Sequence, residues 1–529
     1  MKKLFILLFG LFLSVTGSSQ SCLPDGITFT RQSEIDNFHI NFPNCTQIEG
    51  DVTIIGEDIT NLNGLGVISS IGGNLRIGQA GSATSLTRLT GLDNLTNVGG
   101  SFTLENNDKL TSLSGMERLS HIEGFFTIFV NPVLINLTGL NNLSYLGALA
   151  IQFNDSLIST AGLEGLSSIG SNIFGARVEI SSNASLTSLS GLKNVITIGG
   201  SLRLSDNPAL TNLMELHNLT SIVGNLEISR MYALTSLTGL LNVKSIGGRL
   251  VIYWNDALSD LEGLNNVKSL GSYLQIDSNY GLTSLTGLDS LTTIGGYMQI
   301  DDNRKLTNIN ALHSLHTIGS YVAIYSNPDL SSLTGLNNVQ SIGGFLRVIN
   351  SPALTSLNGF ENLTSIAGAL VINYDSALVS LNGLEKINSN SISALTITGN
   401  TSLSNCAVKS ICDYLGGPNG TIEIHDNAVG CNSQAEVDTT CNHLSVENLT
   451  INGGWLIYPN PAFNHITIET SVTSAKSQLS ILNVSGQVMI ARKITEPKTQ
   501  FDISNLPSGV YFVRVRDERT VQVGKFVKQ

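Results

Sequence analysis

The chain has 529 residues, of which 41% are hydrophobic and only 13% are charged, and its formal net charge is −12. This length is sufficient for two or more domains with a large core, and the low charge content excludes a highly charged disordered chain. An acidic protein lacks the positive electrostatic field that would attract nucleic acids and anionic membranes. The composition therefore predicts a folded protein with no nucleic-acid partner.

The N-terminus has the parts of a secretory signal peptide. Lys2 and Lys3 precede an apolar run over residues 4–13, and small polar residues follow. The run is shorter than the roughly 20 residues that a membrane-spanning helix needs. We expect residues 1–20 to be cleaved and the mature protein to be exported without a transmembrane segment. A lipid-anchored Cys22 is the weaker alternative, because residues 19–21 lack the apolar residue of such sites.

The six cysteines lie in two groups at the ends of a long cysteine-free segment. An even number in an exported chain favours disulfides, and no pair has the C-x-x-C spacing of a metal site. We predict a Cys22–Cys45 disulfide in an N-terminal cap over residues 21–50. A C-terminal cap is expected over residues 401–445, where three pairings are possible for Cys406, Cys412, Cys431 and Cys441.

Between the two groups, a pattern of about 24 residues repeats. From Ile198 to Ile366 every step between equivalent residues is 24 residues. In one repeat Leu202 and Leu204 alternate with polar residues, as in a strand with one buried face, and leucines then recur every three residues along a return path. A fixed period of this size indicates a solenoid. We predict a mainly β protein in which residues 51–400 form a right-handed parallel β-solenoid of about fourteen turns.

One asparagine per turn follows the predicted strand. A polar residue that recurs beside buried leucines is expected to form an internal ladder whose amides bind backbone groups. A row of ligand-binding amides is the weaker interpretation. The residues are Asn107, Asn131, Asn183, Asn207, Asn255, Asn279, Asn303 and Asn327.

Aromatic side chains gather on the outward positions of successive turns, although only 6% of the residues are aromatic. Large amphipathic rings on a rigid sheet bind sugars or protein partners, so we predict a ligand-binding face here. The alternative is an aromatic ladder that only stabilises the sheet. One outward position of four consecutive turns is occupied by Tyr273, Tyr297, Tyr321 and Phe345, and nearby outward positions add Tyr253, Trp254, Tyr325 and Tyr374.

The sequence contains no recognisable catalytic or cofactor motif: H-E-x-x-H, G-x-S-x-G and Walker patterns are all absent. His313 and His316 are expected to be solvated and not to bind metal. Asp277, Asp301 and Asp302 lie on outward positions of adjacent turns, where calcium binding or paired-carboxylate chemistry is the alternative to a solvated face. We prefer the solvated face and predict no catalytic residue, metal or cofactor.

The segment Cys45-Thr-Gln-Ile-Glu-Gly-Asp-Val-Thr-Ile, followed by L-x-x-L-x-x-I-x-G-x-L-x-I turns, resembles the receptor L domain. That family is a leucine-rich-repeat-like β-solenoid found in receptor ectodomains. The resemblance covers roughly residues 45–400 and implies a ligand-binding or adhesive scaffold without naming a ligand. The array has more turns than such a receptor domain usually carries, so the family's mode of binding is not carried over.

The C-terminal region is a separate unit. Residues 446–454 are an expected linker, and short alternating runs over residues 455–529 predict a small Ig-like β-sandwich of seven strands. Four motifs here, Y-P-N-P, V-S-G-Q, L-P-S-G-V-Y-F-V and K-F-V-K, resemble the C-terminal sorting domain of the type IX secretion system. They contain Pro459, Asn460, Pro461, Gly486, Leu506, Gly509, Tyr511 and Lys525.

The second resemblance implies a location and a partner. It implies a Gram-negative bacterium of the Bacteroidetes group, recognition by the type IX secretion machinery, and removal of the domain after passage across the outer membrane. The rest of the chain would be released or attached to surface lipopolysaccharide. Our leading functional hypothesis is a non-enzymatic binding or adhesion protein for a glycan or protein ligand. The alternatives are a structural surface-layer or biofilm spacer and, third, a polysaccharide-acting enzyme.

Overall fold

The structure is a computed structural model that describes residues 20–170, 175–417, 420–444, 455–470, 478–494, 496–516 and 521–529. The predicted signal peptide, up to residue 19, and the predicted linker lie outside the described residues. The chain divides into two compact units, Met1–Cys441 and Asn442–Gln529. Each unit is described by itself.

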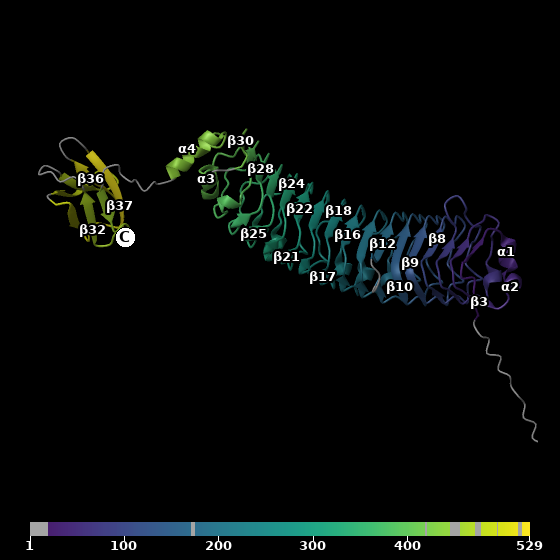
Figure 1. Cartoon of the computed structure of the whole chain (residues 1–529). Helices are drawn as coiled ribbons and strands as arrows, with labels where there is room; N and C mark the ends of the chain where they lie inside the picture. Colours follow the sequence, from purple (N-terminus) through teal and green to yellow (C-terminus); the bar gives the residue numbers. More distant parts are fainter. Residues whose placement is uncertain are drawn as a thin grey trace, which may run out of the picture. The chain divides into compact units, whose positions relative to one another are not determined.

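The first unit is a parallel β-solenoid, as the repeat predicts (Figure 1). In the main ladder each strand pairs in parallel with its equivalent in the next turn, with like residues side by side, such as Leu250 with Leu274 and Ile252 with Ile276. The described part of this ladder contains the strands β2 (Ile27–Phe29), β4 (Val52–Ile54), β6 (Leu75–Ile77), β8 (Phe102–Glu105), β9 (His121–Phe129), β10 (Tyr145–Gln152), β12 (Arg177–Ser181), β14 (Ser201–Ser205), β16 (Leu226–Ser229), β18 (Leu250–Tyr253), β20 (Leu274–Asp277), β22 (Met298–Asp301), β24 (Val322–Tyr325), β26 (Leu346–Ile349), β28 (Leu370–Asn373), β29 (Leu395–Thr398) and β30 (Ile422–His425).

A second ladder of short strands precedes the main-ladder strands from β2 to β28. The two ladders are separated by a sharp corner, where a Cβ atom on Gly271 would lie 2.0 Å from the carbonyl oxygen of Gly247. In β9 and β10 the corner is extended, and one strand serves both ladders. The other short strands are β1 (Gln20–Cys22), β3 (Cys45–Ile48), β5 (Ser70–Ile71), β7 (Asn97–Val98), β11 (Ser168–Ile169), β13 (Thr197–Ile198), β15 (Ser221–Ile222), β17 (Ser245–Ile246), β19 (Ser269–Leu270), β21 (Thr293–Ile294), β23 (Thr317–Ile318), β25 (Ser341–Ile342) and β27 (Ser365–Ile366).

The return path of each turn carries the leucines that recur every three residues. In the turn that begins at β14, Leu210, Leu213, Leu216 and Leu219 are buried in the single core that runs through the solenoid. Several return paths contain a short 3-10 turn, because one leucine must point inward every three residues. These turns are η1 (Asn63–Leu65), η2 (Ser190–Leu192), η3 (Met214–Leu216), η4 (Thr238–Leu240), η5 (Asn310–Ser314) and η6 (Thr334–Leu336). A further 3-10 turn, η7 (Ser389–Ser391), buries no residue and lies directly before β29.

The described solenoid has about 17 turns, so the expectation of about fourteen was too low. The additional turns lie at the ends, where capping residues replace the repeat and hide its period. Strand β2 lies inside the expected N-terminal cap, with α1 (Gln32–Asp36) and α2 (Phe38–Asn41). Strand β30 lies inside the expected C-terminal cap, between α3 (Lys409–Leu415) and α4 (Gln434–Leu444).

Disulfides hold both caps. Cys22 and Cys45 join β1 to β3 at the N-terminal end. Of the three pairings possible among the last four cysteines, the structure contains Cys406–Cys431 and Cys412–Cys441. Covalent links of this kind stabilise terminal turns that have a neighbouring turn on one side only.

The asparagines form the internal ladder that the sequence predicts. Each is fully buried. The Nδ2 atom of Asn279 donates to the carbonyls of Ile252 and Asp277 at 3.0 Å each, and its backbone N–H donates to Oδ1 of Asn303 at 3.1 Å. Its own Oδ1 accepts from the backbone N–H of Asn255 at 3.0 Å. One amide group therefore satisfies backbone groups of its own turn and of the preceding turn.

The ladder is interrupted at three turns. Met231 takes the asparagine position in one turn, and its sulfur lies 3.9 Å from Nδ2 of Asn207. Ser351 and Asp375 take the position in two consecutive turns, where Asp375 Oδ1 accepts from the backbone N–H of Ser351 at 2.7 Å. The other carboxylate oxygen of Asp375 is buried without a hydrogen-bond partner. Burial raises the pKa of Asp375 to about 7.

The second unit contains seven antiparallel strands among its described residues, in two small sheets. The three-stranded sheet has the order β31 (Trp455–Tyr458), β32 (His465–Thr470) and β35 (Lys498–Asp502). The four-stranded sheet has the order β34 (Val488–Lys493), β33 (Gln478–Leu482), β36 (Gly509–Arg516) and β37 (Val521–Lys528). A small separate core lies within this unit and includes Ile468, Ile481, Val513 and Phe526.

We predict that Asn279→Ala destabilises the solenoid by about 3 kcal/mol, since buried backbone groups lose their partners at about 1–3 kcal/mol each. Urea unfolding followed by circular dichroism measures this loss. Asn337→Ala, at an exposed position, is the control and should change stability by less than about 0.5 kcal/mol. Equal stability of the two variants would contradict the structural role of the ladder.

Asp375 should make stability depend on pH. A carboxyl group with a raised folded pKa is protonated more readily in the folded state, so the solenoid should lose stability as the pH rises from about 4 to about 7. The shift corresponds to a loss on the order of 4 kcal/mol. Asp375→Asn supplies the missing N–H donor and should remove most of this loss. Unfolding at pH 4.5 and pH 8 measures it, with the exposed Asp256→Asn as a control that keeps the parent's profile.

Candidate functional site

The predicted aromatic column exists as a continuous stack. Tyr273, Tyr297, Tyr321 and Phe345 each immediately precede a main-ladder strand, from β20 to β26. Successive ring centroids are 4.2, 4.5 and 4.3 Å apart, with interplanar angles of 10°, 5° and 12°. The backbone holds this spacing, because Leu274 N–H donates to the Tyr297 carbonyl at 3.0 Å and the other turns repeat the bond.

The stack determines which parts of the rings are accessible. Each ring covers a face of its neighbour, and the rings are half-buried. At one end the guanidinium of Arg347 lies 4.1 Å from the Phe345 centroid. At the other end Arg249 lies 5.5 Å from the Tyr273 centroid and donates to its hydroxyl at 2.8 Å. The column therefore presents ring edges and hydroxyl groups outward, and burial together with Tyr273 raises the pKa of Tyr297.

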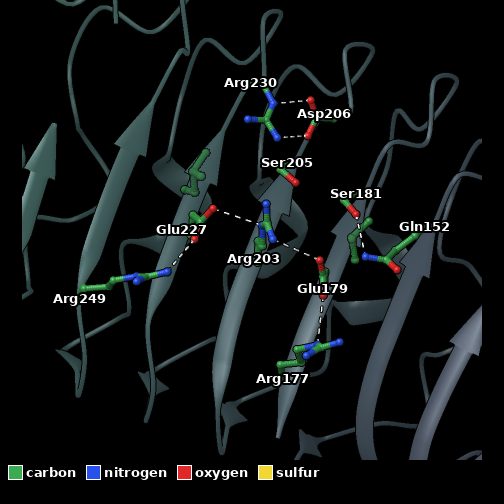
Figure 2. Close-up of polar contacts among 12 residues, drawn as sticks. Gln152, Arg177, Glu179, Ser181, Arg203, Ser205, Asp206, Glu227, Arg230 and Arg249 are labelled. Atoms are coloured by element: carbon green, nitrogen blue, oxygen red, sulfur yellow. Dashed lines mark hydrogen bonds and ion pairs between the residues drawn. The ribbon is translucent and has the colours of Figure 1, made fainter. Parts of the chain in front are cut away.

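A network of ion pairs continues the column toward the N-terminus (Figure 2). Glu227 lies 3.2 Å from Arg249 and 3.2 Å from Arg203, and Glu179 lies 3.5 Å from Arg203 and 3.1 Å from Arg177. At the middle outward position the signs alternate across β12, β14 and β16, and Arg249 directly precedes β18. Alternation stabilises these turns because stacking brings equivalent side chains together, where like charges would repel.

This network is not among the features predicted from the sequence, although its signal is present in the repeat. The middle outward position of consecutive turns reads Glu179, Arg203 and Glu227 at steps of 24 residues. Alternating charge at a fixed period indicates cross-strand pairing in a parallel ladder. A second pair, Arg230 with Asp206, uses two hydrogen bonds of 2.6 and 2.7 Å at the ends of the same strands.

A second row of polar and aromatic residues runs parallel to the column, at the C-terminal ends of the strands. Tyr253, Asp277, Asp301 and Tyr325 occupy equivalent positions of four consecutive turns. Between the two rows lie Gln275 and Gln299. The pKa of Asp301 is raised, first by burial and then by the neighbouring Asp277 and Asp302. Two carboxylates thus lie between two tyrosines on one rigid face.

The other predicted aromatic residues, Trp254 and Tyr374, lie at the edge of this face. Trp254 follows β18 in a left-handed backbone conformation, with φ of 53°, and stacks on Tyr253 with centroids 4.8 Å apart. Tyr374 has the equivalent conformation one turn beyond the column and is 60% exposed. His313 and His316 are exposed on the return path, away from the face. Within the described ranges, no group of three or more His, Cys, Asp or Glu side chains is placed to hold a metal ion.

Two family models match the chain. Residues 324–441 match the receptor L domain, and residues 456–529 match the secretion system C-terminal sorting domain. The last turns of the solenoid are thus similar to the receptor L domain, and the C-terminal unit matches a type IX secretion sorting domain. The first match covers only the last turns and the C-terminal cap, whereas the strand register continues unchanged through the earlier turns. None of the curated proteins matches the chain.

The sorting domain places the protein outside the cell or on its surface. In the described residues, no helix has the length and apolar character needed to cross a bilayer. Two sorting-motif residues have clear structural roles. Asn460 Oδ1 accepts from the backbone N–H of Val527 at 2.9 Å, and the Tyr511 hydroxyl donates to the Pro507 carbonyl at 2.8 Å. The first contact holds the terminal strand β37, and the second braces the turn before β36.

The stack should contribute to stability whether or not it binds a ligand. We predict that Tyr297→Ser lowers the free energy of unfolding by about 2 kcal/mol, because it removes two ring contacts and part of the buried area. Tyr374→Ser, at an exposed position outside the stack, is the matched control and should cost less than about 0.5 kcal/mol. Urea unfolding of both variants measures the difference, and equal losses would show that stacking adds nothing.

Proposed function

We propose that this secreted or cell-surface protein is a non-enzymatic binding or adhesion protein, whose ligand contacts the outward face of the turns from β18 to β26. The observation that supports the proposal is the pairing of two rows on that face. One row presents the edges and hydroxyls of Tyr273, Tyr297 and Tyr321, and the other presents Asp277 and Asp301 between two tyrosines.

A hydroxyl-rich glycan suits these groups best. Carboxylates accept hydrogen bonds from hydroxyl groups, and glutamine amides both accept and donate them. Tyrosine edges add apolar contact area. Because the ring faces of the column are covered by neighbouring rings, the ligand would meet edges and hydroxyls instead of stacking on a face. Backbone pairing holds both rows at a constant spacing, so little conformational entropy is lost on binding. A protein ligand is the alternative, since tyrosines anchor such interfaces as well.

A structural spacer is the second candidate function, and the contacts within the column favour it. The rings, Arg249 and the ion pairs satisfy one another along the solenoid without a ligand. An array whose turns are fastened in this way would serve as a rigid rod in a surface layer. An enzyme that acts on polysaccharides is the weakest candidate and would require Asp277 and Asp301 for bond cleavage.

The test compares binding of the purified exported protein to a glycan array and to extracellular host proteins. The serine variant of Tyr273, Tyr297, Tyr321 and Phe345 should lose at least tenfold in affinity. Asp277→Asn with Asp301→Asn, which preserves shape, should also weaken glycan binding. Glu262→Gln, an exposed acid on the return path, is the control and should bind as the parent does.

The possible results separate the three functions. Unchanged binding by the serine variant and the aspartate variant, with folding verified by circular dichroism, would contradict the proposed face. Absence of binding by the parent, with loss of cell-surface integrity when the gene is deleted, would favour the spacer. Release of shortened glycans by the parent, abolished in the aspartate variant, would identify an enzyme.

A further inference from the structure

We infer that the outward face of the four-stranded sheet in the sorting domain, formed by β34, β33, β36 and β37, is the surface that the secretion machinery recognises. Its partner there would be a protein surface with an apolar centre and an acidic rim. This inference concerns export and is independent of the ligand proposed for the solenoid. It follows from the distribution of charge and of exposed apolar residues within the domain.

Charge separates the sorting domain from the rest of the chain. Residues 456–529 contain nine Lys or Arg and five Asp or Glu residues, a net charge of +4 in a chain with a net charge of −12. The four strands of the larger sheet contain no acidic residue at all, and they contain Arg492, Lys493, Arg514, Arg516, Lys525 and Lys528. The nearest acids, Asp517 and Glu518, follow β36 and lie outside the described residues.

Strand alternation places basic and apolar residues on the same outward face. In β36 the side chains of Tyr511, Val513 and Val515 enter the core, so Val510, Phe512, Arg514 and Arg516 point outward. The register with β37 sets Lys525 opposite Phe512 and Val523 opposite Arg514. On the other side of β33, Val488 and Lys493 of β34 belong to the same face.

The apolar residues of this face are accessible. Phe512 is 36% exposed, Val523 46% and Val488 47%. A monomeric domain rarely exposes a group of large apolar side chains on one sheet face unless a partner covers it. Basic residues around them select an acidic partner and exclude a second copy of the same face, which would repel.

The three-stranded sheet also exposes an apolar residue, Leu456 at 63%, but it lacks a charge of one sign. Its outward residues include Glu469, Lys498 and Asp502, and Lys498 lies 4.0 Å from Glu469. The Tyr458 hydroxyl donates to the same glutamate at 2.7 Å. Opposite charges are thus paired within that face, so the face does not present a charge of one sign that a partner could recognise. The contrast makes Lys498 a matched control for Lys525.

The fold also explains why this face is presented reliably. Asn460, from the segment that follows β31, accepts from Val527 N–H and donates to the Lys525 carbonyl at 3.3 Å. The backbone N–H of Ala462 donates to the Val527 carbonyl at 2.8 Å. These bonds hold β37 against the domain, so Val523 and Lys525 remain aligned with β36. The Y-P-N-P motif therefore acts as a positioning element for the face.

The experiment uses the full chain, expressed in a bacterium that possesses the type IX secretion machinery. The combined Arg514→Glu, Arg516→Glu and Lys525→Glu variant should reach the medium and cell surface at least tenfold less than the parent, and should accumulate folded in the periplasm. Lys498→Glu should be exported as the parent is. Arg514→Lys with Arg516→Lys retains the charge and should be exported normally. Thermal unfolding of each purified variant verifies that the domain is folded.

Three outcomes would overturn the inference. Normal export of the triple glutamate variant would show that the face is not read, and an equal defect in Lys498→Glu would show that overall charge matters instead of this face. Binding of the parent, but not of the triple variant, to vesicles that contain lipopolysaccharide, together with normal export, would assign the face to an anionic lipid. A second-site mutation that exchanges an acid for a base in a machinery protein and restores export would support the inference.

Discussion

The solenoid depends on one constraint, which is that every residue of a turn lies beside its equivalent in the next turn. Parallel pairing, which is in register except at shifts between β1 and β3 and between β9 and β10, brings like residues together at a separation of about 4.8 Å. Each position of the repeat therefore becomes a column, and a column is stable only if its side chains tolerate identical neighbours. Leucine and isoleucine meet this condition inside the core, where they pack without a polar atom to satisfy.

Polar columns meet the same condition in different ways. Asparagine works in the interior because its amide carries both a donor and an acceptor, so each copy can bind the next. Aspartate at residue 375 has the acceptor only, and burial raises its pKa as a consequence. Glutamate and arginine form ion pairs when they alternate in a column, as Glu179, Arg203 and Glu227 do. Tyrosine forms a column by stacking its rings, which stabilises the turns and at the same time covers the ring faces.

This double use of the tyrosines shapes the functional proposal. A stack that fastens four turns together also produces a rigid row of hydroxyls and edges on the outside. A ligand-binding face and a structural fastener are thus two consequences of one arrangement, and only binding measurements separate them. The sorting domain is not subject to this constraint, because the strands of its antiparallel sheets do not repeat and their side chains need no identical neighbours. It separates its charges between two faces instead, and this separation gives one face a single sign.

The sequence by itself determined the architecture of this protein. Three features were sufficient to predict the parallel ladder and its internal amides: the 24-residue period, the alternation of Leu202 and Leu204, and the asparagine row. In a repeat, equivalent residues of successive turns contact one another, so a local pattern also predicts the long-range contacts. The four C-terminal motifs predicted the sorting domain in the same direct way. The tertiary structure decided three features that the repeat period does not predict. It set the pairing of Cys406 with Cys431, the turns hidden inside the caps, and the stacking that covers the faces of Tyr297, because each depends on how side chains meet in space across elements that no repeat describes.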